Sequence, residues 1–227
     1  MPIWTKNLTE LLNIFLQSHC PLCQRSTPSE LCQNCERQLR KCHISDPSSQ
    51  WQEPLPVFSW GIYGGSLKRA IAVMKYENKP QIARPLGQWL GEAWLLNSPR
   101  PVDTKRLVVV PIPLHASKQK QRGYNQAALI ARSFCNTTGL KVKLNGIERV
   151  RETKAQFGLS ASEREKNLAA AFTVGQGFRH QHQDASVLLV DDIYTTGATA
   201  AAAAQTLRQC GITVLGLVAL ATTIKNT

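Results

Sequence analysis

The sequence predicts an α/β fold, a parallel sheet flanked by helices, with a small zinc knuckle at the N-terminus. Three observations carry this prediction. Apolar strand-like segments alternate with amphipathic helical segments from about residue 57 onward. The chain has 227 residues, 43% of them hydrophobic, which suits one domain with a real core and a small appendage. Two closely spaced Cys-x-x-Cys motifs lie between residues 20 and 35.

The strand-like segments of the main domain are apolar or nearly so, and they are predicted at 57–63, 107–114, 187–192 and 212–221. Helical segments are predicted between and after them, at 65–78, 83–96, 124–139 and 199–211. Continuous apolar strands separated by helices are typical of a parallel sheet that is covered on both faces. In such sheets ligands bind beyond the carboxyl ends of the strands.

The composition divides the chain into three parts: residues 1–44 as an N-terminal helix and cysteine knuckle, 45–56 as a Ser/Pro-rich linker, and 57–227 as the main domain. Leucines at helical spacing in residues 8–15 predict a short amphipathic helix. Cys135 and Cys210 fall on predicted helices and are expected in the core.

The cysteine motifs predict a structural zinc site. Each Cys-x-x-Cys lets two thiolates bind one ion from a single turn, and two such turns supply the tetrahedral sulfur set that zinc prefers. The N-terminal segment does not have the pattern of a secretory signal, so paired disulfides or a redox pair are the weaker alternatives. The predicted ligands are Cys20, Cys23, Cys32 and Cys35.

The positive charge is concentrated in the middle of the chain. Residues 100–166 hold fourteen Lys/Arg and five Asp/Glu, which gives +9 of the total net charge of +12. This imbalance favours a polyanionic ligand, such as a diphosphate or nucleic acid, over an acidic one. A solvated basic surface is the alternative that composition does not separate from these.

An acidic pair, Asp191 and Asp192, follows the apolar residues 187–190 directly. No cationic residue stands beside the pair in sequence, and unpaired buried carboxylates are costly, so we expect both to face an open site. Adjacent acceptor-only groups suit a vicinal diol such as the two hydroxyls of a ribose.

The next residues predict a phosphate site. They run from the acidic pair into an alanine-rich helix, whose N-terminal N–H groups attract anions. The residues expected to hold the phosphate are Thr195, Thr196, Gly197, Ala198 and Thr199. A diol site next to a phosphate site amounts to recognition of a ribose 5-phosphate. The alternative is a chance strand–turn–helix.

A basic loop follows the strand at 107–114. Lys118, Lys120 and Arg122 are candidates for neutralising an anion, with a solubilising charged loop as the alternative. Gly123 permits an unusual backbone turn, and Asn125 is expected to reach a ligand together with Arg122.

The segment 187–199 resembles the binding signature of type I phosphoribosyltransferases. The resemblance implies that phosphoribosyl diphosphate, usually with magnesium, is the ligand, and that the fold is type I phosphoribosyltransferase-like. It also implies that the loop carrying Lys118, Lys120 and Arg122 binds the diphosphate. Residues 149–172 would then form a mobile lid with Arg149, Thr153, Gln156 and Arg164, or else a surface linker.

Along nearly the whole chain the motifs resemble the ComF family of late competence proteins. The motifs are the Cys-x-x-Cys pair, "MKY" at 74–76, "VPIPL" with "RGYNQ", and "VDDIYTTGAT". A familiar variant of the family has Phe where this chain has Tyr124, and Val at Ile193; both changes are conservative. The resemblance implies a cytoplasmic role in natural transformation: handling incoming single-stranded DNA with a competence helicase and the DNA-uptake channel proteins. No apolar run reaches the ~20 residues of a transmembrane segment, so none is expected.

Two further functions stay open at this stage. An active transferase would move the phosphoribosyl group to a nitrogen nucleophile, and a regulatory protein would bind the precursor without consuming it. No acceptor site is evident: no hood is expected after residue 221, and residues 57–98 are the candidate for one, with Trp60, Tyr63, Lys75 and Tyr76 as its lining. Few aromatic residues interleave with the basic ones, which argues against a dedicated base-stacking surface.

Overall fold

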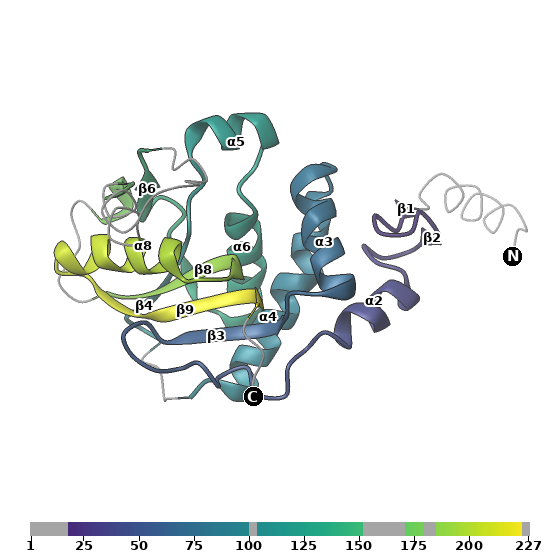
Figure 1. The fold of residues 1–227 in the computed structure, drawn as a ribbon, viewed down its shortest axis with the longest axis horizontal. Helices are drawn as coiled ribbons and strands as arrows, with labels where there is room; N and C mark the ends of the chain where they lie inside the picture. Colours follow the sequence, from purple (N-terminus) through teal and green to yellow (C-terminus); the bar gives the residue numbers. More distant parts are fainter. Residues whose placement is uncertain (1–17, 100–103, 152–170, 179–184, 224–227) are drawn as a thin grey trace, which may run out of the picture.

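A five-stranded parallel sheet lies at the centre of a computed structural model of the chain, which describes residues 18–99, 104–151, 171–178 and 185–223 (Figure 1). The strand order is β3-β9-β8-β4-β5. The strands are β3 (Val57–Ile62), β9 (Thr213–Thr222), β8 (Ser186–Tyr194), β4 (Leu107–Pro111) and β5 (Lys141–Val142). The predicted strands at 57–63, 107–114, 187–192 and 212–221 are therefore confirmed, and β5 is an added edge strand.

The side chains of β8 alternate between the two faces of the sheet. Val187 and Leu189 belong to one buried cluster, and Leu188 and Val190 belong to the other. Because a strand has a period of two, this central strand is apolar on both faces and reads as a continuous run in the sequence.

Helices cover both faces. Helices α3, α4 and α6 belong to the cluster that contains Leu188, and α8 belongs to the cluster that contains Leu189. Their bounds are α3 (Gly65–Tyr76), α4 (Ala83–Asn97), α6 (Gln126–Thr138) and α8 (Ala198–Gln209), with a short 3-10 turn η1 (Pro80–Ile82) before α4. None of the helices within the described ranges is both long and apolar enough to cross a membrane.

The predicted fold class is confirmed: an α/β parallel sheet flanked by helices, with a cysteine cluster near the N-terminus. Three details differ from the sequence prediction. First, the basic loop contains a short helix, α5 (Ala116–Arg122). Second, β6 (Ile147–Arg149) and β7 (Phe172–Val174) form an antiparallel hairpin, which is followed by a 3-10 turn, η2 (Gln176–Phe178). The prediction for Cys210 is wrong, because α8 ends at Gln209 and leaves this residue exposed, whereas Cys135 is buried as expected.

The knuckle packs on α3 and α4. It consists of the hairpin β1 (Ser18–His19) and β2 (Ser26–Thr27), followed by α2 (Gln33–Arg40). Arg69 of α3 donates a hydrogen bond of 2.6 Å to the Leu22 carbonyl, and Arg84 of α4 pairs with Glu30. Buried Cys20, Cys35 and Leu39 join the same cluster as α3 and α4.

The segment 45–56, predicted as a linker, lies along the edge of the sheet. Ser59 donates a backbone hydrogen bond to Pro47, and Val57 donates one to Gln50. The Trp51 ring packs on Trp94 of α4, with 5.4 Å between ring centroids. The domain boundaries 1–44, 45–56 and 57–227 stay a prediction.

Candidate functional site

The acidic pair lies inside β8, near its carboxyl end. Strand β8 continues to pair with β9 as far as Tyr194, opposite Thr222, and both strands end on the side of the sheet where α3 stands (Figure 1). Neighbouring residues on a strand point to opposite faces, so the two carboxylates meet different neighbours. Asp192 is buried, with 8% of its surface exposed, and Asp191 is partly buried.

Lys75 neutralises Asp192 from the last turn of α3. Its Nζ atom lies 2.7 Å from Oδ2 and 2.8 Å from Oδ1 of Asp192, and the two side chains are only 18% and 11% exposed. No cationic residue stands beside Asp192 in sequence, but the fold supplies one. The partner comes from 117 residues away, where no local pattern reveals it.

The pKa of Asp191 is strongly raised. Burial, followed by the nearby charge of Asp192, raises its pKa to about 7, while the Asp192 backbone N–H, Lys75 and Arg149 act in the opposite direction. The Asp191 carboxylate accepts a 2.8 Å hydrogen bond from that N–H. Near neutral pH Asp191 is therefore poised between its two forms, beside an Asp192 that is paired with Lys75.

The turn after β8 presents an open helix N-terminus. Thr195, Thr196 and Ala198 are exposed, and Thr199 is partly exposed. Gly197 is the N-terminal cap of α8 and has a φ of 77°, a left-handed conformation that favours glycine. Gly197 has no side chain to cap α8, and the Ala198 N–H makes only a long 3.5 Å hydrogen bond to Thr196 Oγ1, so the first turn of the helix can still bind an anion. All five predicted phosphate-binding residues thus lie at one turn.

Helix α5 displays the predicted cationic residues. Lys118 and Lys120 are exposed, and Arg122 is partly exposed at its end. Gly123 ends the helix with a φ of 83°. The Arg122 guanidinium donates to the side-chain oxygen of Gln126 and lies 5.6 Å from the ring centroid of Tyr76.

Asn125 serves the fold. Its Oδ1 accepts a 3.0 Å hydrogen bond from the Ala127 N–H and caps α6, while its Nδ2 donates to the Ile112 carbonyl at 3.0 Å. These bonds fix the chain between β4 and α6, so Asn125 helps to hold the segment that carries α5 in place. Its predicted contact with a ligand stays a prediction.

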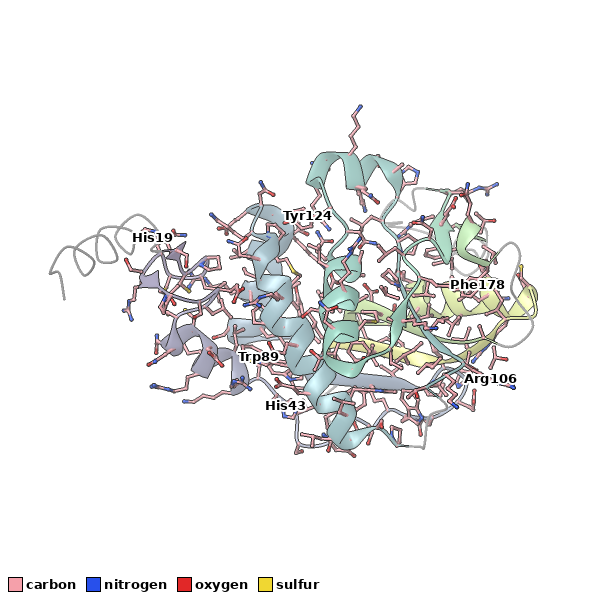
Figure 2. All side chains as sticks on the ribbon, turned by 180° about the vertical axis from the view of Figure 1, so that it is seen from behind. His19, His43, Trp89, Arg106, Tyr124 and Phe178 are labelled. Carbon is pink, nitrogen blue, oxygen red and sulfur yellow. The ribbon has the colours of Figure 1, made fainter. Side chains whose placement is uncertain are left out.

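A hollow of about 610 Å³ lies between the end of α3 and α5. Lys75 lines it and also contacts Asp192, so the hollow adjoins the acidic pair. The Tyr124 ring borders it and donates its hydroxyl to the Met74 carbonyl, and Figure 2 shows this side chain beside α3. The full lining is Lys75, Tyr76, Asn78, Lys118, Lys120, Gln121, Arg122, Gly123 and Tyr124.

Arg149 lies close enough to the acidic pair for its charge to act on Asp191. It ends β6, its guanidinium is 5.5 Å from the Phe172 ring centroid, and its charge lowers the pKa of Asp191. The structure thus brings this residue of the predicted lid to the acidic pair. The other lid residues, Thr153, Gln156 and Arg164, lie outside the described residues.

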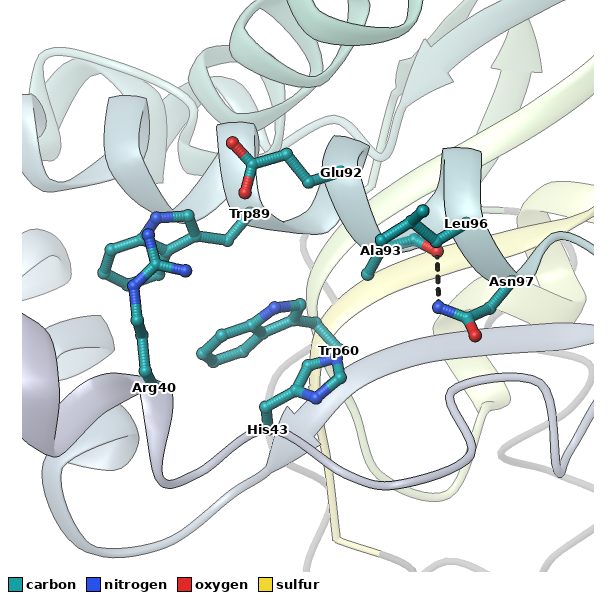
Figure 3. Close-up of a pocket in the computed structure, with 8 residues that line it drawn as sticks. All are labelled: Arg40, His43, Trp60, Trp89, Glu92, Ala93, Leu96 and Asn97. Carbon is teal, nitrogen blue, oxygen red and sulfur yellow. Dashed lines mark hydrogen bonds between the residues drawn. The ribbon is translucent and has the colours of Figure 1, made fainter.

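The proposed hood residues divide into two groups. Trp60 is buried and stacks on Trp89 of α4 at 5.7 Å between centroids, with His43 tilted against it and Arg40 over Trp89 (Figure 3). It joins the knuckle to the sheet. Lys75 and Tyr76, in contrast, face the hollow.

The four cysteines of the knuckle form one cluster. Their Sγ atoms all lie within 4.8 Å of one another, so the cluster is able to hold a metal ion such as zinc. Burial raises the pKa of the Cys20 thiol, but the backbone N–H groups of Cys32, Leu22 and Cys23 and the Cys23 side chain lower it to about 7. A thiol that ionises this readily suits metal binding.

Known proteins of similar sequence identify the family. "Competence protein F" of Haemophilus influenzae is 30% identical over 210 residues, covering 88% of this chain and 89% of that protein. The chain belongs to the ComF family. "DNA utilization protein YhgH" of Salmonella typhi is 29% identical, covering 85% of each chain, and "Competence protein ComFC" of Bacillus subtilis is 27% identical, covering 85% of this chain and 72% of that one. No protein-family model matches the chain.

Solved structures of phosphoribosyltransferases align with this ComF chain at low identity. Orotate phosphoribosyltransferase of Aeropyrum pernix is 17% identical, with a TM-score of 0.35 over 68% of this chain and 64% of that one. Adenine phosphoribosyltransferase of Leishmania donovani is 13% identical, with a TM-score of 0.40 over 83% and 67%.

Proposed function

We propose that this ComF protein binds phosphoribosyl diphosphate and acts in natural transformation, handling incoming single-stranded DNA in the cytoplasm. One observation carries the ligand: the acidic pair near the end of β8 leads within a few residues to the open N-terminus of α8. Carboxylates suited to hydroxyls and N–H groups suited to a phosphate stand at one edge of the sheet, which is the pair of groups that a ribose 5-phosphate requires.

In this proposal the two carboxylates accept hydrogen bonds from the ribose hydroxyls. Lys75 balances the charge of the Asp192 carboxylate through their ion pair. Burial and the neighbouring charge favour the protonated form of Asp191, so near neutral pH a ligand that supplies hydrogen-bond donors or positive charge promotes its ionisation. The backbone N–H groups at the start of α8 and the hydroxyls of Thr195, Thr196 and Thr199 hold the 5-phosphate.

The diphosphate lies toward the cationic residues of α5 in this proposal. Lys118, Lys120 and Arg122 supply positive charge there, with Gln156 and Arg164 as the predicted contribution of the lid. The oxygen atoms of Asp191 and Asp192 are the type of ligand that magnesium prefers, and a magnesium ion bound with the diphosphate would neutralise part of its charge.

Thermal unfolding with and without phosphoribosyl diphosphate and magnesium tests the ligand. The wild type is expected to gain several degrees, because ligand that binds only the folded state stabilises it. The double variant Asp191→Asn/Asp192→Asn removes the charged acceptors at constant size and is expected to gain nothing. If the wild type itself is not stabilised, the protein lacks a competent sugar-phosphate site.

Two observations support the role in DNA handling: the similar proteins are named for competence and DNA utilisation, and residues 100–166 carry a net charge of +9. Phosphate-backbone contacts depend on charge and weaken steeply with salt. Fluorescent single-stranded DNA is therefore expected to bind at low salt with an affinity that falls as salt rises. If no binding occurs at low salt, direct DNA handling is excluded, and the proposed helicase and uptake-channel partners would have to carry the DNA.

We also propose that Cys20, Cys23, Cys32 and Cys35 hold a structural zinc ion. The cluster lies where the knuckle packs on α3 and α4, so the metal would fix the position of α2. Metal analysis of the purified protein is expected to find about one zinc per chain. Cys32→Ser, which changes a half-buried ligand, is expected to lose the zinc, and Cys42→Ser nearby is expected to keep it.

An active transferase is the second candidate, and the hollow beside Lys75 favours it, since a second substrate placed there would lie next to the sugar. The reaction breaks the bond between C1 and the diphosphate and joins C1 to a nitrogen nucleophile. Charge stabilisation of the leaving diphosphate would supply most of the rate, with no strong base required. Release of diphosphate that depends on an added nitrogen base tests this candidate.

A further inference from the structure

A second hollow, of about 250 Å³, lies at the seam between the knuckle and the main sheet (Figure 3). Helix α2 and the turn after it form one wall, and α4 and β3 form the other. None of its lining residues lines the hollow between α3 and α5, so it is a separate feature. The lining is Arg40, His43, Trp60, Trp89, Glu92, Ala93, Leu96 and Asn97.

The end of α4 leaves two neighbouring leucines in solvent beside this hollow. Leu95 is 58% exposed and Leu96 is 82% exposed, and Leu96 also lines the hollow. Exposed apolar side chains that gather beside a concavity mark an interaction surface, whereas single ones scattered over a protein do not. The seam therefore has the shape and the apolar rim of a docking site.

Stacked rings form the floor of the hollow. Trp60 and Trp89 are 3% and 4% exposed, with 5.7 Å between their ring centroids. The Arg40 guanidinium lies 4.5 Å from the Trp89 ring centroid, and its Nε donates a 2.9 Å hydrogen bond to the Glu36 carboxylate. The shape therefore exists before a partner arrives, which lowers the entropy cost of binding. Tryptophan and arginine are also the residue types that dominate the energetics of protein interfaces.

Positive charge borders the hollow on the side of the knuckle. Residues 33–43 contain three Lys/Arg and a single Glu, and that Glu is paired with Arg40. Arg37 and Lys41 are exposed, and Arg37 lies one helical turn before Arg40. Glu92 is the one carboxylate in the lining. A partner that fits this seam must bring an apolar side chain to the hollow and negative charge to α2.

These observations favour a protein segment over the other possible occupants. A second copy of this chain would place the same cations against each other, on molecules that each carry a net charge of +12. Nucleobases stack on exposed ring faces, and both tryptophans of the hollow are almost fully buried. A membrane surface would cover the two leucines but leave the concavity without packing partners.

We propose that this hollow is the docking site for an acidic amphipathic segment of a partner protein. An apolar side chain of the segment fills the space between Trp60 and Leu96, its neighbours pack on Leu95, and its carboxylates lie against Arg37 and Lys41. One wall belongs to α2, whose start carries two of the four clustered cysteines, so the site requires the knuckle to be in place. The proposal adds a protein contact to the proposed function and does not depend on the sugar-phosphate site.

Selection of short random peptides from a displayed library tests the site, with the full-length wild-type protein as the target. The enriched peptides are expected to carry net negative charge together with at least one large apolar residue. Labelled copies of these peptides are then titrated into the wild type and its variants, with fluorescence anisotropy as the readout. Binding is expected to weaken as the salt concentration rises, because the cations of α2 contribute to it.

Two pairs of variants at exposed positions separate the apolar and the charged parts of the site. Leu95→Ser/Leu96→Ser is expected to weaken peptide binding about tenfold. Val150→Ser, which changes a side chain that is 54% exposed next to β6, is its control and should bind like the wild type. Arg37→Glu is expected to weaken binding about fivefold at low salt and less at high salt. Lys141→Glu makes the same change in net charge on β5 and should have little effect.

All of these variants should unfold at the same denaturant concentration as the wild type, because they change exposed side chains. The proposal is rejected if no acidic peptide is enriched, if the peptides bind Leu95→Ser/Leu96→Ser as tightly as the wild type, or if Arg37→Glu and Lys141→Glu weaken binding equally.

The other occupants are tested on the same double leucine variant. If it keeps the peptides but loses single-stranded DNA, loses anionic lipid vesicles, or dissociates from a dimer in sedimentation velocity, the face belongs to that occupant and the proposal is wrong. Stabilisation of the wild type by phosphoribosyl diphosphate reports separately on the proposed function, so either proposal can fail while the other stands.

Discussion

The β8–α8 half of the proposed site is built into the sheet, whereas the α3–α5 half stands on the surface. Strand β8 is paired on both sides, and α8 buries six of its residues. None of the residues of α5, in contrast, is buried. The difference teaches that the proposed sugar-phosphate half is part of the packed sheet and its covering helix, while the proposed diphosphate half depends on a few side-chain contacts.

A substitution at Gly197 is expected to have the largest effect, because the rigid half tolerates little change. In Gly197→Ala the left-handed φ becomes strained, and the added methyl group would lie 2.7 Å from the Tyr194 hydroxyl oxygen. Ribose 5-phosphate binding, measured by calorimetry, is expected to weaken roughly 30-fold through loss of charge-assisted hydrogen bonds, and the free energy of unfolding to fall by about 1 kcal/mol.

Gly211→Ala is the matched control, since Gly211 has a φ of 76° at the other end of α8 and open space around it. It is expected to lose similar stability and to keep the affinity. If both variants lose affinity equally, the open helix N-terminus is not the phosphate site.

Lys75 joins the two halves, and its substitution is expected to have the next largest effect. Lys75→Met leaves Asp192 buried without its partner. We expect the free energy of unfolding to fall by about 2 kcal/mol, which is below the range for fully buried pairs because both side chains are slightly exposed. We also expect phosphoribosyl diphosphate to bind roughly tenfold more weakly. Denaturant unfolding and calorimetry measure the two effects. Lys68→Met, on the exposed side of the same helix, is the control and should have the stability and the affinity of the wild type. If the Lys75 and Lys68 variants have the same stability and affinity, Lys75 is not part of the site.

The raised pKa of Asp191 predicts a pH dependence. If ribose hydroxyls bind the ionised form, affinity should rise about tenfold between pH 6 and pH 8, as a group with a pKa of about 7 ionises. The stability of the unliganded protein changes in the opposite direction. Because the pKa of Asp191 is raised above its unfolded value near 4, its contribution to stability is fully present below pH 4 and is lost as the pH rises through 7. In Asp191→Asn the affinity should be nearly independent of pH across this range. If the affinity of that variant changes with pH as steeply as that of the wild type, Asp191 is not the cause.

The exposed half is expected to respond least to substitution. Lys118→Ala/Lys120→Ala removes two exposed charges from α5, so the stability should stay within about 0.5 kcal/mol. Affinity for diphosphate is expected to fall about fivefold at low salt and to differ little from wild type at high salt. Lys141→Ala, exposed on β5, is the control. A salt-independent loss would mean that the lysines act through the fold of α5.

The same comparison explains what the sequence could predict. The β8–α8 half is continuous in the chain, so strand, acidic pair, phosphate turn and helix all appear in order in residues 187–209. The cysteine cluster is predictable for the same reason, since its motifs lie within sixteen residues of one another.

The rest depends on tertiary contacts. Lys75 and Asp192 meet because the sheet edge places α3 beside β8, and Tyr76 meets Arg122 because α5 stands over the end of α3. The basic segment itself contains few aromatic residues, and the ring beside Arg122 is that of Tyr76, which comes from α3. Helix α5 was missed because it has no buried face and hence no apolar period.

Calorimetry with the separate parts of the ligand tests most directly the central claim, that two differently built halves form one site. The account predicts that ribose 5-phosphate binds the wild type and loses that binding in Asp191→Asn/Asp192→Asn, while diphosphate with magnesium loses affinity in Lys118→Ala/Lys120→Ala. Phosphoribosyl diphosphate should bind more tightly than either part. Ribose 5-phosphate binding that survives the loss of both carboxylates would contradict the account.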